Sequence, residues 1–369
     1  MPLRGPSGYE GQSFITGVAA EGAPGACPKH MDYGPCGGVE LDGRCEVAEF
    51  ACVFLDAPTR VWDGIPVGPP PTQAADPVPP PTPSAGAVAM RELLATRPIV
   101  VADFPARALD AVSIADCAAV LRGRVDAVLA GDSGSARVQF PPAYRARLIQ
   151  DAGLAVWSGF TCRDRNRVAM EAELAALSHA GVSGVHCVTG DHTLTGSRPD
   201  AAPVFDLDST EAASLARAAG HLVSVAEAPA TPPVERRAAR LLEKQHAGAE
   251  LCFANHSGGV EPIARFIAEA RALGVTMGFI PCIPVVVDRT SAQLLASFTT
   301  LVLPDGYLDG ILAADDPLEA GIAAAAELGR GFLELDGVVG VNLSGGAGRG
   351  RELAYAAALA EISDELGLS

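Results

Sequence analysis

Short apolar runs alternate with amphipathic stretches from about residue 87 to the end of the chain. Eight of these runs are rich in Val, Ile, Leu and Phe with little polar alternation, as strands buried on both faces are. They are Ile99–Phe104, Ala127–Ala130, Leu154–Gly159, Val185–Thr189, Leu222–Ala226, Leu251–Ala254, Thr276–Ile283 and Val338–Leu343. Amphipathic periodicity predicts helices between them, most clearly over Arg167–Ala180, Ser209–Ala219, Pro233–His246 and Val260–Leu273.

This repeat predicts an α/β fold, a (β/α)₈ TIM barrel, because its number of units and its length both match that fold. An open doubly wound sheet is the alternative. It is disfavoured because no G-x-G-x-x-G follows the first strand. Residues 300–337 predict extra helix before the eighth strand.

The first part of the chain has a different pattern. Four of its nine cysteines fall within the first 52 residues, and a Pro-rich stretch from Gly64 to Gly86 follows them. Such a stretch favours extended geometry and cannot pack as a helix or a central strand. We therefore expect a small cysteine-rich module over residues 1–62, a linker over 63–86 and the barrel over 87–369.

The charge balance limits the partners. The chain has 27 basic and 44 acidic residues, a net charge of −17, which disfavours nucleic acid and anionic membrane surfaces. No apolar run reaches the roughly 18–20 residues of a membrane span. Met1 to Gly11 lacks the apolar stretch of a signal peptide. We expect a cytoplasmic protein whose cysteines are thiols or metal ligands before disulfides.

The four N-terminal cysteines are Cys27, Cys36, Cys45 and Cys52. Four thiolates in so short a segment can close a tetrahedral metal site, and a module of this size rarely folds without such a staple. Zinc is the first expectation and an iron–sulfur cluster the second. His30 could replace one ligand. The alternative is a set of free thiols in a loop-rich cap.

Polar residues at the carboxyl ends of the predicted strands are candidates for chemistry, because TIM barrels place their active sites there. These candidates are Asp103, Asp132, Ser133, Thr161 to Asn166, Asp191, His192, Glu227, Asn255, His256, Asn342 and Ser344. Acids, amides and hydroxyls spread over many strands suit a polar heterocycle better than a metal centre. The glycine-rich stretch from Ser344 to Gly350 could bind phosphate or be a plain loop.

Several motifs resemble one family in coherent order. The cysteine-rich segment, with Gly34-Pro35-Cys36-Gly37-Gly38 and Asp42-Gly43-Arg44-Cys45, resembles the module that accompanies methylenetetrahydrofolate reductases of the acetogen type. The segment from Thr161 to Arg167 resembles the strand-3 motif of these reductases, and Val188-Thr189-Gly190-Asp191-His192 resembles their strand-4 motif. Pro203 to Ser209, and Lys244 with Ala247-Gly248-Ala249, resemble two further segments.

The resemblance implies a flavin-bearing barrel that transfers hydride between a cofactor and 5,10-methylenetetrahydrofolate or 5-methyltetrahydrofolate. It implies a catalytic role for Asp191, flavin phosphate binding by Lys244, and pterin binding by Asn255 in place of a glutamine. By position, Asp103 is a second catalytic candidate, Glu227 and Thr161 bind substrate, and Asn166, His192 and Ser344 bind cofactor. The expected partners are a tetrahydrofolate derivative, a redox protein and further copies of the chain.

Three departures from the family pattern leave the cofactor open. The glutamate that ends the family's first strand aligns with Ala102, and Asp103 comes one residue later. The Phe-Asp after the glutamine is replaced at Ser257-Gly258-Gly259, and Thr189 stands where many members have arginine. FMN, FAD, a deazaflavin or a dissociable nicotinamide all remain open. The alternatives in function are a folate-binding or electron-transfer accessory subunit and a tetrahydrofolate-dependent demethylase.

Overall fold

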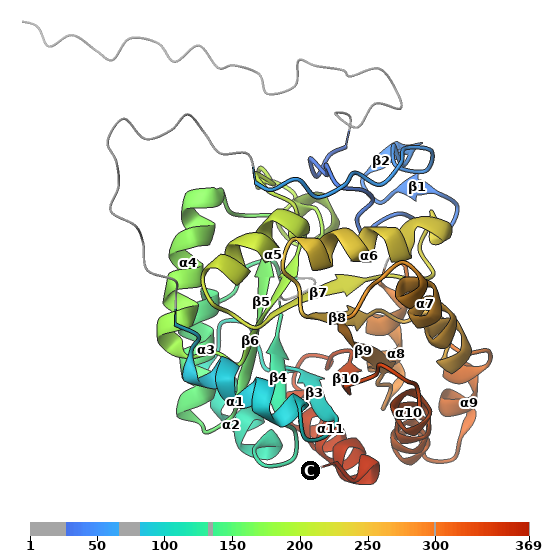
Figure 1. Ribbon diagram of the computed structural model, residues 1–369. Helices are drawn as coiled ribbons and strands as arrows, with labels where there is room; N and C mark the ends of the chain where they lie inside the picture. The colour runs from blue at the N-terminus through green and yellow to red at the C-terminus, as the bar shows by residue number, and fades with distance from the viewer. Residues whose placement is uncertain (1–26, 66–81, 132–135, 299, 369) are drawn as a thin grey trace, which may run out of the picture.

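Eight parallel strands form a closed barrel in the computed structural model, which describes residues 27–65, 82–131, 136–298 and 300–368. The strands follow one another around the barrel in chain order, and the last pairs with the first (Figure 1). They are β3 (Ile99–Asp103), β4 (Ala127–Ala130), β5 (Val156–Thr161), β6 (Gly184–Val188), β7 (Val223–Glu227), β8 (Leu251–Ala254), β9 (Gly278–Pro284) and β10 (Gly340–Ser344).

Helices surround this barrel on the outside (Figure 1). They are α1 (Ala85–Leu94), α2 (Ala111–Leu121), α3 (Pro142–Asp151), α4 (Arg167–Ala180), α5 (Ser209–Ala218), α6 (Arg237–His246), α7 (Val260–Ala272), α8 (Arg289–Ala296), α9 (Tyr307–Ala313), α10 (Pro317–Leu333) and α11 (Glu352–Leu366). The eight predicted strands and the four predicted helices are all present within a few residues, so the predicted TIM barrel is confirmed. The extra helix predicted over residues 300–337 corresponds to α9 and α10.

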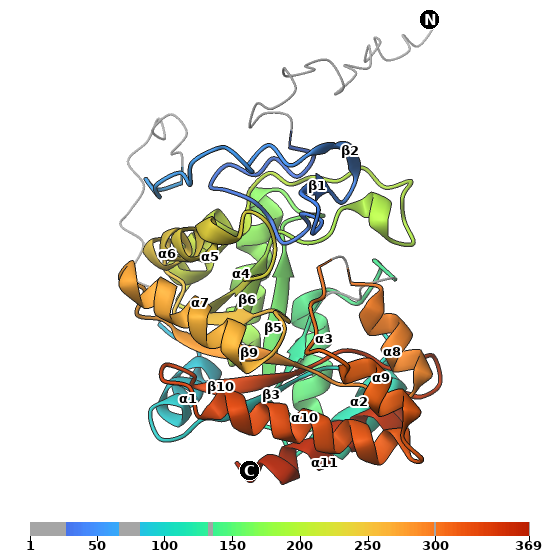
Figure 2. The ribbon, with the colours of Figure 1, turned by 90° about the vertical axis from the view of Figure 1, so that its right-hand side faces the viewer.

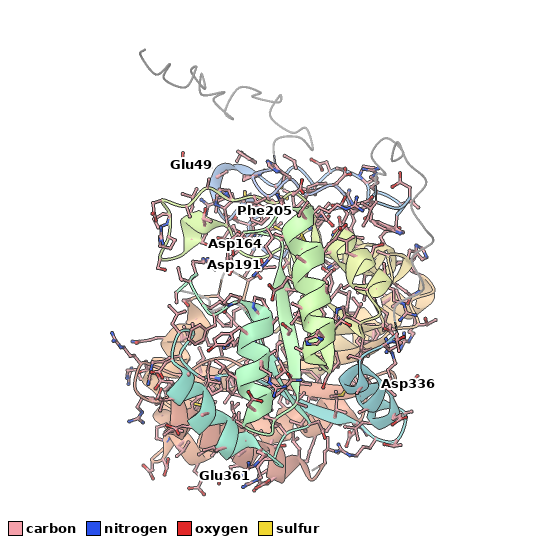
Figure 3. The ribbon with its side chains drawn as sticks, turned by 90° about the vertical axis from the view of Figure 1, so that its left-hand side faces the viewer. Glu49, Asp164, Asp191, Phe205, Asp336 and Glu361 are labelled. Atoms are coloured by element: carbon pink, nitrogen blue, oxygen red, sulfur yellow. The ribbon has the colours of Figure 1, made fainter. Side chains whose placement is uncertain are left out.

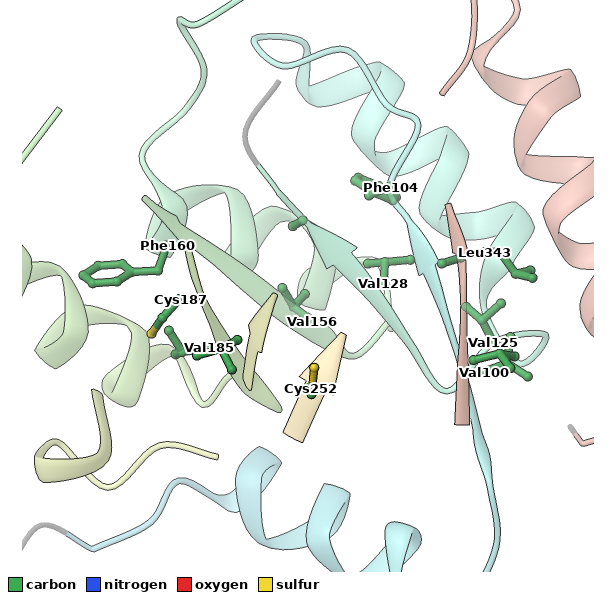
Figure 4. Close-up of a cluster of buried hydrophobic side chains, with 14 of the residues drawn as sticks. Val100, Phe104, Val125, Val128, Val156, Phe160, Val185, Cys187, Cys252 and Leu343 are labelled. Carbon is green, nitrogen blue, oxygen red and sulfur yellow. The ribbon is translucent and has the colours of Figure 1, made fainter. Parts of the chain in front are cut away.

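Strand alternation divides the apolar side chains into two sets. Outward-facing residues such as Val100, Val128 and Leu343 pack against the helices in the larger core cluster (Figure 4). Inward-facing residues such as Val101 and Trp157 fill the barrel and form a second cluster, which α1 closes at the amino ends of the strands. A residue's position in its strand therefore decides whether it faces the helices or the mouth.

Asp and Asn side chains begin several helices by accepting backbone N–H groups. Asp110 does so for α2, Asn166 for α4 and Asp208 for α5. At α5, Glu211 completes a capping box by accepting the backbone N–H of Asp208. These caps fix the loops that lead from the strand ends into the helices.

The cysteine-rich module is described from Cys27 to Ile65 and has a short antiparallel pair, β1 (Arg44–Cys45) and β2 (Ala48–Ala51). Met31, Val53 and Phe54 form its small core. The module lies on the loops that follow β6 and β7, at the carboxyl end of the barrel (Figure 2). Most of the expected linker lies outside the described residues. Within the described part of the chain, no helix is long and apolar enough to cross a membrane.

Candidate active site

Asp103 is the last residue of β3 and faces the barrel interior. Its neighbour Ala102 packs among the outward residues, whereas Val101 belongs to the inward cluster. Alternation therefore turns Asp103 inward, where its Oδ1 accepts a hydrogen bond from Asn342 Nδ2 (3.0 Å). Its Oδ2 accepts from Ser344 Oγ (2.9 Å). A regular strand thus places this carboxyl in the mouth.

Gly345 donates its backbone N–H to the same Oδ2 of Asp103 (3.0 Å). Its φ is +148°, and a Cβ there would lie 2.4 Å from the hydroxyl oxygen of Tyr355. Glycine is required here because the backbone must come close to both Asp103 and Tyr355. Burial raises the pKa of Asp103, although its three hydrogen-bond donors act in the opposite direction.

Asn342 and His256 extend this polar side of the mouth across β10, β9 and β8. Asn342 pairs in register with Cys282 of β9, and its Nδ2 lies 3.7 Å from the Cys282 thiol. His256 follows β8, and its Nδ1 lies 3.1 Å from the Cys282 carbonyl oxygen. The neighbouring Asn255 is half-buried at the next inward position after Phe253. Asp103, Asn342, Ser344, Asn255 and His256 therefore form one polar arc.

The opposite side of the mouth is apolar. The inward positions near the ends of β4, β6 and β7 are Leu129, Val188 and Ala226, and all three are partly exposed. Gly159 of β5 leaves this part of the surface without a side chain. A larger residue would not fit there, because its Cβ would lie 2.6 Å from the Gly131 Cα. A flat ring can lie on this surface while the polar arc binds its heteroatoms.

Asp191 lies in the loop after β6, with its side chain 61% exposed. Its Oδ2 is 3.3 Å from Arg137 NH1. Arg137, Arg165 and Arg198 line an adjoining cavity of about 450 Å³ between the loops that follow β4, β5 and β6. Figure 3 shows Asp164, Asp191 and Phe205 at the module end of the barrel, with Asp336 at the far end. This cavity offers cationic donors to an anionic group.

Glu227 and Lys244 lie on the outer side of the barrel. Glu227 ends β7 and is buried against α6, where its Oε2 lies 2.7 Å from Lys244 Nζ. Arg237 NH1 is 3.2 Å from its other oxygen, Oε1. The expected substrate-binding carboxylate and the expected phosphate-binding lysine therefore neutralise each other behind the strands.

Four other candidates also have partners within the chain. Thr161 is buried and donates its hydroxyl to the Thr189 carbonyl (3.2 Å). Asn166 caps α4. His192 accepts the Leu194 N–H (3.2 Å) and stacks on Phe205. Ser344, expected to bind cofactor, instead positions Asp103. Asp132 and Ser133 lie outside the described residues.

The four module cysteines are half-buried and free of disulfides. Burial raises the pKa of Cys27 and Cys52 to about 11, and the neighbouring Cys36 raises both further. Gly38 N–H donates to Cys36 Sγ (3.3 Å). Among the described residues, no three His, Cys, Asp or Glu side chains are arranged to hold a metal ion. Zinc and the iron–sulfur cluster therefore remain predictions.

The arginine-lined cavity is the feature that sequence reasoning missed. Arg165 was a candidate only as one residue of the segment from Thr161 to Asn166, and Arg137 had no signal because it lies in a loop without a motif. Their joint position depends on how the loops after β4, β5 and β6 fold together. His256 and Asn342 were candidates by position at strand ends, and the structure brings both to Cys282.

These features define the class: a (β/α)₈ barrel with a buried carboxyl and a polar arc at its catalytic end. The methylenetetrahydrofolate reductase family profile matches residues 129–334, more than half of the chain, and the chain belongs to this family. Residues 11–63 match a second family, described as methylene-tetrahydrofolate reductase C terminal. Membership places the protein in folate one-carbon metabolism.

One solved structure of similar fold binds a folate. A protein from Clostridium thermocellum, described as binding two copies of 5-methyl-5,6,7,8-tetrahydrofolic acid, has a TM-score of 0.56 at 12% identity. The alignment covers 76% of this chain and all of that one. A 2,3-dimethylmalate lyase of the PEP mutase/isocitrate lyase superfamily has a TM-score of 0.41 at 14% identity, over 70% of this chain and 80% of that one. No curated protein matches the chain.

Proposed function

We propose that the protein transfers hydride between a cofactor and the one-carbon unit of 5,10-methylenetetrahydrofolate or 5-methyltetrahydrofolate. One observation carries this proposal: the first barrel strand ends in an inward carboxyl whose pKa is raised by burial. A carboxyl whose pKa is raised keeps its proton to higher pH than an exposed carboxyl does, and it can act as a general acid. The folate-binding barrel from C. thermocellum supports the same class of ligand.

Reduction of the methylene compound begins when its imidazolidine ring opens to an iminium ion, and the departing nitrogen needs a proton. In this proposal Asp103 supplies that proton. The apolar side of the mouth excludes water from the iminium carbon, which hydroxide would otherwise attack.

A phosphate-bearing flavin fits the donors of the arginine-lined cavity better than it fits Lys244. Arg137, Arg165 and Arg198 would hold its phosphate, and the apolar surface formed by Leu129, Val188 and Ala226 would support its ring. When bound, such a flavin supplies the hydride. The role of Asp191 in this proposal is to position Arg137 beside that phosphate, through the contact between their side chains.

The Asp103→Asn variant tests the proposed acid. It removes the proton donor but keeps a side chain of the same size, so we expect turnover of 5,10-methylenetetrahydrofolate to fall by about 100-fold or more. Binding of 5-methyltetrahydrofolate, measured by calorimetry, should change little. Asp151→Asn, the same change at an exposed carboxylate on α3 that pairs with Arg147, is the control for nonspecific loss. Wild-type turnover by Asp103→Asn would contradict the acid assignment.

A folate-binding accessory subunit is the second candidate. It is favoured because Lys244, Asn166, His192 and Ser344, the residues expected to bind cofactor, all have partners within the chain. Wild-type protein would then bind tetrahydrofolate but transfer no hydride with FMN, FAD, a deazaflavin or nicotinamide as donor. Turnover with any of these donors would exclude this candidate.

The module, its boundaries and its metal complete the proposal. We place the module over residues 1–62 and a linker over 63–86, with zinc bound by Cys27, Cys36, Cys45 and Cys52. Metal analysis of the purified full chain should give about one zinc per chain, and Cys45→Ser should lower that content. Iron with acid-labile sulfide would instead indicate a cluster, and a metal-free wild type would contradict both. A redox partner and self-association remain part of the same proposal.

A further inference from the structure

Two buried side-chain atoms in the polar arc have no hydrogen-bond partner among the described residues. They are Nε2 of His256 and Oδ1 of Asn342. His256 is 9% exposed and Asn342 is 1% exposed. Buried polar atoms are nearly always paired in folded proteins, so each unpaired one requires an explanation. Both side chains contact Cys282, Asn342 from β10 and His256 from the loop after β8, and Asn342 also contacts Asp103 at the mouth.

The contacts of the two side chains determine what these atoms can bind. The Cys282 carbonyl oxygen can only accept a hydrogen bond, so Nδ1 of His256 must carry the ring proton. Burial lowers the pKa of His256 to about 4, and the imidazole is therefore neutral at physiological pH. In the neutral ring the other nitrogen, Nε2, is unprotonated and is an acceptor.

The amide of Asn342 has the same character. Its Nδ2 donates to Asp103 Oδ1, and this contact fixes which end of the amide is the oxygen. The unpaired Oδ1 is therefore an acceptor, like Nε2 of His256. Two buried acceptors without donors repel a phosphate or carboxylate, because the oxygens of these anions are themselves acceptors. They require a ligand with N–H or O–H donors, and the proposed substrate offers N–H groups.

We propose that His256 Nε2 and Asn342 Oδ1 are recognition atoms for the substrate and accept hydrogen bonds from the amino-amide edge of its pterin ring. This inference rests on the proposed function, which supplies a tetrahydrofolate as substrate. That edge carries two kinds of donor, the 2-amino group and the ring N3–H, and each can donate to one of these acceptors. Asn342 then links recognition to catalysis, because its other amide atom binds the acid Asp103.

Calorimetric affinities of two ligands test this assignment. The ligands are tetrahydrofolate and its 2-desamino-2-methyl analogue, measured with wild type, His256→Phe and Asn342→Leu. Each variant should bind tetrahydrofolate about 10-fold or more weakly, because one hydrogen bond to the ligand is lost. Wild type should also prefer tetrahydrofolate to the analogue by about 10-fold, and at least one variant should lose this preference. If the two side chains had only a structural role, each substitution would weaken the binding of both ligands equally.

His221→Phe is the matched control. His221 is also buried, and its ring contacts one backbone carbonyl, that of Leu174 (3.0 Å), but it precedes β7 at the opposite end of the barrel. It should keep wild-type affinities for both ligands. In ¹⁵N-histidine spectra of the wild type, the Nε2 signal of His256 should be that of an unprotonated nitrogen and should shift when tetrahydrofolate binds.

The outcomes separate the two proposals. If wild type binds tetrahydrofolate and both variants bind it equally well, or if both keep the wild-type preference between the ligands, this inference is wrong and the proposed function stands. A protonated Nε2 in the free protein would also overturn the inference. If wild type binds no tetrahydrofolate, the proposed function fails and the inference fails with it. The ¹⁵N spectrum needs no variant and remains decisive if a substitution prevents folding.

Discussion

Lys244 shows how the surroundings of one residue decide its role. Its Nζ lies 2.7 Å from Glu227 Oε2 and donates to the Ala226 carbonyl oxygen (2.6 Å). Burial lowers the pKa of Lys244, and the charge of Glu227 opposes that effect. For Glu227, burial acts to raise the pKa, but the charges of Lys244 and Arg237 outweigh it and the pKa is lowered. A buried carboxylate that loses one cation leaves charge uncompensated in a medium of low polarity.

Lys244→Met should therefore lower the free energy of unfolding by about 3–5 kcal/mol, because Glu227 loses one of the two cations paired with it and keeps Arg237. The affinity of the folded variant for FMN should stay unchanged. Urea unfolding and FMN fluorescence measure the two quantities. Arg330→Met, which removes an exposed contact with Glu365, is the control and should cost less than about 1 kcal/mol. A stable variant with weakened FMN binding would instead support the expected role of Lys244 in binding the flavin phosphate.

At the scale of an element, the start of α5 contains a proton-linked cap. Glu211 accepts the Asp208 N–H (2.8 Å), and its pKa is raised to about 7, first by burial and then by Asp208, Asp32 and Asp206. The folded state therefore holds a proton that the unfolded chain releases near its ordinary pKa of 4.5. This contribution to stability is complete below that pKa and is lost as the pH rises through about 7.

Glu211→Gln keeps an acceptor for the Asp208 N–H but does not titrate. We expect it to unfold like the wild type at about pH 4 and to be more stable by about 1 kcal/mol at about pH 8, a value reduced for partial solvent screening. Urea unfolding at the two pH values measures this difference. Glu319→Gln, at the exposed start of α10, should show no such pH dependence. A constant difference between wild type and Glu211→Gln would show that the carboxyl does not titrate in this range.

The elements could be predicted from the sequence because each strand is apolar throughout and each helix has its own periodicity. The site could be predicted only in part. Matching Ala102 to the family glutamate did not show which way Asp103 points. Neighbouring residues of a strand point to opposite faces, so a shift of one residue in the alignment reverses the expected direction. The same parity turns Glu227 toward α6 and away from the mouth. The arginine-lined cavity depends on three loops, and loop conformation has no periodic signal.

At the scale of the whole molecule, the cysteine-rich module is held by side chains that follow β7. Arg236 NH1 donates to the carbonyl oxygens of Phe54 (3.2 Å) and Ala57 (2.5 Å). Arg237 NH1 donates to the Cys36 carbonyl oxygen (3.1 Å). The module covers the loops beside Asp191, so its position helps to determine the shape of the arginine-lined cavity. Docking of the module and binding at the mouth should therefore be coupled.

Arg236→Ala tests this docking. It removes two charge-assisted hydrogen bonds to the module and leaves the barrel core intact, so amide exchange over residues 27–65 should become about 10-fold to 100-fold faster. Exchange in the barrel strands should stay at the wild-type rate, as hydrogen-exchange mass spectrometry can show for each segment. Arg198→Ala, whose partner is the nearby and exposed Asp200, is the matched control and should leave the module protected. Unchanged exchange in Arg236→Ala would mean that the other contacts between module and barrel, such as Arg237 with Cys36 and the Trp62 N–H with Glu243, hold the module without Arg236.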